Sequence, residues 1–171
     1  MNYDKDQVVL VDTNVIIEAH ATNVWKSIAD FFALETVVKC VEETQTGYQN
    51  RTPEQQIDQS LLLTSFVTVH DPSEEDRFAV RLEHESLDDL DAGERDLIVH
   101  AFGRTDDVWL LASPDKAAMR FISELNLTNK LVSLESMAKR VGTKPRKAFK
   151  SQYTEKWHAI ERSNLLLSTK N

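Results

Sequence analysis

The sequence predicts an α/β protein built on a mostly parallel β-sheet. Short, almost entirely apolar runs recur along the chain, as expected of strands that are buried on both faces. Segments with helical spacing separate these runs, and alternating strands and helices are typical of a parallel sheet. With only four Gly and four Pro in 171 residues, long linkers are not expected.

The predicted strands are the runs richest in β-branched and aliphatic residues. Each is bounded by polar or turn-forming residues, as in the segments VVLVD, FVTVH and VWLLA. The five predicted strands are residues 8–12, 36–41, 66–70, 108–112 and 131–134.

Helical spacing and capping residues mark the segments between these strands. Ser73 is a suitable N-cap, and Ser113 with Pro114 forms a favourable helix opening. Gly47 and Pro53 interrupt the long second helical stretch. The predicted helical segments are 15–34, two within 42–64, then 74–85, 92–102, 114–125, a short one after 134, and 147–167.

The length suits one domain with one core, and the boundary near Gly142 divides the chain into a body, 1–142, and an extension, 143–171. No apolar run approaches the roughly 18 residues that a membrane span requires. The polar N-terminus does not resemble a secretory signal. Because the single Cys40 cannot form an internal disulfide, we expect a cytoplasmic protein.

Charge is distributed unevenly along the chain. The net charge is −8, but residues 144–171 contain seven Lys or Arg and two Glu, so the acidic excess lies in the body. In the extension, apolar side chains recur at helical spacing, which predicts an amphipathic helix packed on the acidic body. The alternative is that its basic residues contact RNA phosphates. The candidates for that contact are Lys144, Arg146, Lys147 and Lys150.

Four carboxylates are predicted at one edge of the sheet. Asp12 ends the first strand, Glu43 follows the second, Asp115 follows the fourth, and Glu94 opens the helix before the fourth. In a parallel sheet, ligands bind beyond the carboxyl ends of the strands. Two unit charges about 4 Å apart cost roughly 4 kcal/mol at an effective dielectric near 20. A hard divalent cation with oxygen ligands would offset that cost.

Each acid also has a structural explanation. Asp91 and Glu94 fit a capping box at the start of a helix. Asp115 could complement a helix dipole, Glu43 could be a solvated surface residue, and Asp12 could cap or turn the chain together with its neighbours. Taken together, the four acids favour a metal site.

Four segments resemble the motifs of the PIN-domain family, in order along residues 8 to about 141. VDTN after an apolar strand resembles the opening motif, and the second motif has a Glu four residues before a Gly, which favours Glu43 over Glu42. The third has the GE-x-acid form of VapC-like ribonucleases from one bacterial subgroup. The matching segments are VDTN, VVKCVEETQTG, LDAGERDLIVHA and WLLASPDKAAMRF.

This resemblance implies a three-layer fold with five parallel strands in the order 3-2-1-4-5. It also implies cleavage of RNA phosphodiesters that depends on Mg²⁺ or Mn²⁺, as in the toxins of toxin–antitoxin pairs. An antitoxin protein and a second copy of the chain are then candidate partners. Asp12, Glu43, Glu94 and Asp115 would be the metal ligands, with Asp96 as a further one at a second metal. The side chains that would orient these carboxylates are Thr13, Asn14 and Ser113.

Three other functions are possible for such a fold, and the sequence bears on each of them. An aspartyl phosphatase needs a second Asp where Asn14 stands, and a phosphoreceiver domain needs an acidic pair beside the first strand. A non-catalytic PIN-like module that binds RNA or protein stays open. His100 stands where the family usually has a small or hydroxyl residue. The five His show no zinc-like spacing, so surface or helix-face roles are expected for them, and Cys40 is expected to be a core residue.

Overall fold

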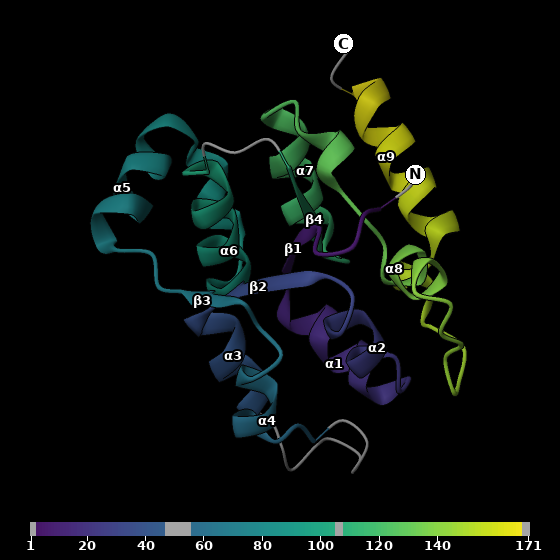
Figure 1. Cartoon of the computed structure of the whole chain (residues 1–171). Helices are drawn as coiled ribbons and strands as arrows, with labels where there is room; N and C mark the ends of the chain where they lie inside the picture. Colours follow the sequence, from purple (N-terminus) through teal and green to yellow (C-terminus); the bar gives the residue numbers. More distant parts are fainter. Residues whose placement is uncertain (1–2, 47–55, 105–107, 169–171) are drawn as a thin grey trace.

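A four-stranded parallel sheet forms the centre of the computed structural model, which describes residues 3–46, 56–104 and 108–168. The strands run in the order β3-β2-β1-β4, and every neighbouring pair is parallel (Figure 1). Their bounds are β1 (Val8–Val11), β2 (Ala33–Val37), β3 (Thr68–His70) and β4 (Trp109–Ala112). The predicted α/β class and parallel sheet are confirmed.

The expected fifth strand is wrong within the described ranges. Leu131 makes a single parallel bridge to Leu111 of β4, and the N–H of Val132 donates to the Leu111 carbonyl at 2.9 Å. Helix α8 (Leu134–Arg140) then begins, with the Ser133 hydroxyl as its N-cap. Because this capped helix starts so soon, the segment has no room for a strand and keeps one bridge beside β4.

The second strand lies three residues earlier than predicted. It spans Ala33–Val37, and α3 (Val38–Gln45) takes up the rest of the expected strand. Cys40 and Val41 are buried, so packing outweighs the weak helix propensity of β-branched residues. The helix expected at 15–34 is two helices, α1 (Thr13–Ala21) and α2 (Trp25–Ala29).

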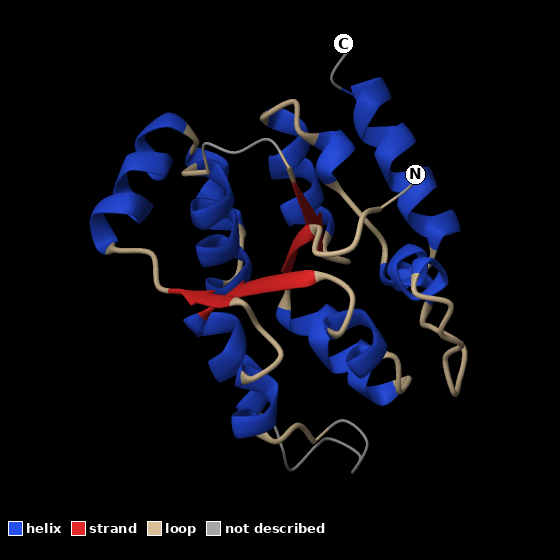
Figure 2. Cartoon of the chain, viewed as in Figure 1, coloured by secondary structure: helices blue, strands red, loops and turns tan. Residues whose placement is uncertain are grey.

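Helices cover both faces of the sheet (Figures 1 and 2). Side chains of a strand alternate between the faces, so Val9 packs with α1, α2 and α8, whereas Leu10 packs with α5, α6 and α7. The helical segments not yet located are α4 (Gln59–Leu63), α5 (Glu74–Glu83), α6 (Ala92–Phe102), α7 (Lys116–Glu124), α9 (Glu155–Ser168) and the short turns η3 (Glu85–Asp89), η4 (Thr128–Lys130) and η5 (Ser151–Tyr153). The predicted break near Gly47 and Pro53 lies outside the described residues.

The C-terminal extension shares the core of the body. Tyr153 is buried in the cluster that contains α1 and α8, and Lys116 on α7 pairs with Glu161 on α9 at 2.7 Å. The helix begins at Glu155 and not near residue 147. The preceding segment lies along α1, where the N–H of Lys150 donates to the Glu18 carboxylate at 3.0 Å. None of the described helices has the length and apolar character needed to cross a membrane.

Candidate functional site

Asp12 is placed at the carboxyl end of the sheet by the pairing of β1 with β4. Its N–H continues that ladder by donating to the Ala112 carbonyl at 3.1 Å. The side chain is 1% exposed, and its Oδ2 atom has no hydrogen-bond partner among the described residues. Burial raises the pKa of Asp12 to about 7, and the negative charges of Asp91 and Glu43 add to the rise. A buried carboxylate with an unpartnered oxygen is costly in this state.

Glu94 lies in the first turn of α6 and is 5% exposed. The predicted cap is confirmed, because Oδ1 of Asp91 accepts from the Glu94 N–H at 2.9 Å. The pKa of Glu94 is raised to about 8. Burial is the largest cause, and the negative charges of Asp115, Asp12 and Asp91 also raise it. The carboxylates from three separate chain segments are therefore electrostatic neighbours.

Glu43 ties the start of α1 to the start of α6. Its Oε2 accepts from the Thr13 hydroxyl at 2.7 Å, and its Oε1 accepts from the Gly93 N–H at 3.0 Å. A Cβ on Gly93 would lie 2.4 Å from Oε2, so only glycine permits this approach. Because Thr13 follows Asp12 and Gly93 precedes Glu94, Glu43 fixes the relative positions of those two acids.

Asp115, and not the expected Ser113, caps α7. Its Oδ1 accepts from the N–H groups of Ala117 at 2.6 Å and Ala118 at 3.1 Å. Ser113 supports this arrangement, since its hydroxyl accepts from the Asp115 N–H at 3.2 Å. Helix α7 begins two residues later than predicted because Asp115 provides the better acceptor. Within the described ranges, no hydrogen bond involves Oδ2 of Asp115.

The four predicted acids thus gather at one edge of the sheet. We call this group, with Asp91, the carboxylate edge. The carboxylate oxygens of this group lie farther apart than the ligand atoms of a single bound ion. Across residues 3–46, 56–104 and 108–168, the atoms of the carboxylate edge do not form a group of three ligand atoms all within 4.8 Å of one another.

The remaining predicted residues lie in different settings. Both carboxylate oxygens of Asp96 accept hydrogen bonds from Arg77, at 2.7 and 2.8 Å. Because a guanidinium already pairs with Asp96, we do not include Asp96 among the proposed metal ligands. The Asn14 side chain is exposed. The four basic residues proposed to contact RNA are all exposed; they are Lys144, Arg146, Lys147 and Lys150.

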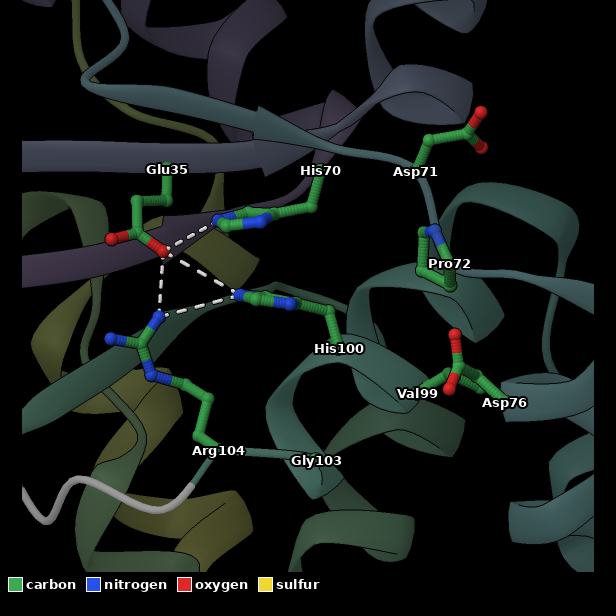
Figure 3. Close-up of a pocket in the computed structure, with 9 residues that line it drawn as sticks. All are labelled: Glu35, His70, Asp71, Pro72, Asp76, Val99, His100, Gly103 and Arg104. Carbon is green, nitrogen blue, oxygen red and sulfur yellow. Dashed lines mark hydrogen bonds and ion pairs between the residues drawn. The ribbon is translucent and has the colours of Figure 1, made fainter.

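A second group of ionisable side chains lies between the sheet and α6 (Figure 3). We call Glu35, His70, His100 and Arg104 the histidine cluster. Oε2 of Glu35 lies 2.9 Å from Nε2 of His70, 3.5 Å from Nε2 of His100 and 2.6 Å from Nη1 of Arg104. The two imidazole rings are stacked, with centroids 3.6 Å apart. The cluster lines a cavity of about 520 Å³.

The electrostatics of this cluster differ from those of the carboxylate edge. Burial opposes ionisation of Glu35, but hydrogen bonds from His70 and Arg104 lower its pKa. Burial also lowers the pKa of His100, and the nearby His70 and Arg104 contribute to this shift. The ligand atoms of Glu35, His70 and His100 all lie within 4.8 Å of one another, so these three residues could hold a metal ion.

The expectation that the histidines occupy surface or helix-face positions missed this cluster. Glu35 and His70 are 35 residues apart, and His70 and His100 are 30 residues apart, so no local spacing brings these three together in the sequence. Two signals were present. Glu35 is the charged residue in the otherwise uncharged segment ALETV, and His100 departs from the family pattern on the apolar helix LIVHAF. The expectation for Cys40 as a core residue is confirmed.

Comparisons with known proteins give no match. The sequence matches no protein-family model, and searches of curated proteins and of solved structures find no match either.

Proposed function

We propose that this chain is a nuclease that hydrolyses RNA phosphodiester bonds with a divalent ion, Mg²⁺ or Mn²⁺, at the carboxylate edge. One observation carries the proposal. Asp12 and Glu94 are buried acids with raised pKa values, and the charges around them are other acids. Carboxyl groups whose pKa values are strongly perturbed by burial and by neighbouring charges are candidates for a functional site.

The residues present fit a hard cation. The donors are carboxylate oxygens, which Mg²⁺ and Mn²⁺ prefer. The unpartnered Oδ2 of Asp12 is an available ligand atom at the end of a buried strand. Glu94 and Asp115 would complete the direct ligands, and Glu43 would act through a water, because Thr13 and Gly93 already bind its oxygens. When bound, such an ion lowers the pKa of a coordinated water and stabilises charge on phosphate oxygens.

The protein's own groups supply the positioning. Glu43 and Gly93 hold the starts of α1 and α6 together, which keeps Asp12 and Glu94 at neighbouring positions. Ser113 fixes the backbone of Asp115. Such prearrangement limits the reorganisation that binding would otherwise require.

RNA as the substrate rests on the resemblance to PIN domains and on the exposed basic segment 144–150. This segment lies along the C-terminal half of α1, where the N–H groups of Arg146 and Lys150 donate to the Thr22 carbonyl and to the Glu18 carboxylate. A toxin role with an antitoxin partner follows from the resemblance alone.

An RNA cleavage assay tests the proposal. We expect single-stranded RNA to be cut with Mn²⁺ or Mg²⁺ and not in EDTA. Asp12→Asn should lower the rate at least a hundredfold, since a metal contributes several kcal/mol of transition-state stabilisation. Glu42→Gln is the matched control, because Glu42 is exposed, paired with Lys39 and adjacent to Glu43. Its rate should equal that of the wild type.

Two results would contradict this function. Cleavage by Asp12→Asn at the wild-type rate would show that the carboxylate edge is not the active site. Binding of RNA without cleavage under any divalent ion would favour a non-catalytic PIN-like module.

A further inference from the structure

The histidine cluster is a separate place in the fold from the carboxylate edge. Glu35 lies in the middle of β2 on the face covered by α6, and His70 is the last residue of β3. His100 follows Glu94 by six residues on α6, which corresponds to roughly 9 Å along the helix axis. An ion at the histidine cluster would therefore not share the ligands of the carboxylate edge.

The spacing of the three ligand atoms suits a small ion. Two donors each about 2.05 Å from a tetrahedral ion lie roughly 3.3 Å apart. In the protein, the Glu35 oxygen lies 2.9 Å from one imidazole nitrogen and 3.5 Å from the other. These distances bracket the required value. Figure 3 shows both rings presenting the same edge to Glu35, whereas Asp71 points away from the cluster.

The donor chemistry selects the class of ion. Two imidazole nitrogens and one carboxylate oxygen suit zinc and its neighbours among the transition metals, whereas Mg²⁺ prefers oxygen ligands. Metal binding requires neutral imidazole and ionised carboxylate.

Arg104 is the competitor for such an ion. Its Nη1 lies 2.6 Å from the Glu35 oxygen and 3.3 Å from Nε2 of His100, so it supplies positive charge where a metal would bind. An entering ion would displace the guanidinium from Oε2 and tilt the stacked rings apart. The adjoining cavity of about 520 Å³ gives space for these movements.

We propose that Glu35, His70 and His100 form a transition-metal site of the zinc class. When no ion is bound, the guanidinium of Arg104 supplies the positive charge at this position. The site is independent of the proposed nuclease function and takes a different kind of ion. The cavity that these residues line leaves room beside them for a water or a small-molecule ligand to complete the coordination of the ion.

Calorimetric titration of the full-length, chelator-treated protein with Zn²⁺ tests this inference. We expect one Zn²⁺ per chain at this site in the wild type and in Asp12→Asn. His100→Gln should weaken binding at least a hundredfold, which exceeds the 10–100-fold loss typical of residues that only support a metal ligand. Arg104→Met, which removes the competing charge, should tighten binding about tenfold.

Controls separate this site from other effects. His84→Gln removes a histidine that packs on Phe102 and Phe121 outside the cluster, and its Zn²⁺ affinity should be unchanged. Circular dichroism without metal checks that each variant folds. If His100→Gln does not fold, His70→Gln is titrated in its place. The visible absorption of Co²⁺ bound to the wild type then serves as a second measurement. A spectrum typical of octahedral all-oxygen coordination would overturn the proposal.

The proposal is also overturned if the wild type takes up no Zn²⁺, or if His100→Gln binds it as tightly as the wild type does. Binding that disappears in Asp12→Asn but persists in His100→Gln would assign the ion to the carboxylate edge. RNA cleavage by His100→Gln with Mn²⁺ should remain at the wild-type rate, so failure of this inference leaves the proposed function untouched.

Discussion

The carboxylate edge and the histidine cluster contain the same chemical group in opposite electrostatic situations. In both, a carboxylate lies buried beside a strand of the same sheet. The pKa values of Asp12 and Glu94 are raised, because burial acts together with neighbouring acids. The pKa of Glu35 is lowered, because Arg104 and His70 outweigh burial. Burial alone therefore does not decide the direction in which a carboxyl pKa shifts, because the sign of the neighbouring charge can reverse its effect.

Neutralising each carboxylate should have opposite consequences in the metal-free protein. Glu35→Gln removes the carboxylate that pairs with Arg104 and His70, and it should lower the free energy of unfolding by about 3 kcal/mol. A lowered carboxyl pKa provides stability at every pH above the unfolded value near 4.5, so this cost should be present at both pH 5 and pH 8. Urea unfolding at both pH values measures it. A cost under about 1 kcal/mol would show that the pair is not an important contact.

Asp12→Asn should show the reverse trend with pH. A raised carboxyl pKa gives stability below the unfolded value near 4, and this stability is lost as the pH rises through the folded value of about 7. The wild type should therefore lose stability between pH 5 and pH 8 relative to Asp12→Asn, by on the order of 2 kcal/mol. The same unfolding series measures this difference. Parallel pH profiles for the two proteins would contradict the assignment of Asp12 as an uncompensated acid.

The smallest expected effect concerns the contact that holds the carboxylate edge together. Gly93→Ala forces the Glu43 carboxylate away, because the new Cβ would lie 2.4 Å from Oε2. We expect a loss of about 1–2 kcal/mol in thermal unfolding, as for other overpacked sites. Gly103→Ala is the matched control, since its Cβ would meet only ordinary contacts at 3.7 Å and beyond. Equal stability of the two variants would show that Glu43 does not need its present position.

Much of the architecture could be predicted from the sequence because it depends on local patterns. The strands at VVLVD, FVTVH and VWLLA, the cap at Ser73 and the helix beginning at Ala92 all appear near the expected residues. The position of β2 could not be predicted, because VVKCV favours a strand locally and only packing makes it a helix. The fifth strand failed for a similar reason, since the cap at Ser133 starts a helix after one bridge.

The candidate site divides in the same way. Strand ends placed Asp12 and Asp115 at one edge of the sheet, because topology determines where strands end. The roles of Asp91 and Gly93 needed the folded chain, since they depend on contacts across 50 residues or more with Glu43 and Asp12. Asp96 was expected near a metal, but Arg77 comes from a different helix and no spacing in the sequence indicates that pair.

The central claim is that the acids of the carboxylate edge bind a divalent ion in place of protons. Calorimetric titration with Mn²⁺ at pH 7, in two buffers with different ionisation enthalpies, tests it directly. Because the pKa values of Asp12 and Glu94 lie at about 7 and 8, binding should release protons, and Asp12→Asn should bind at least tenfold more weakly. Mn²⁺ binding of equal strength in both proteins, without proton release, would contradict the claim.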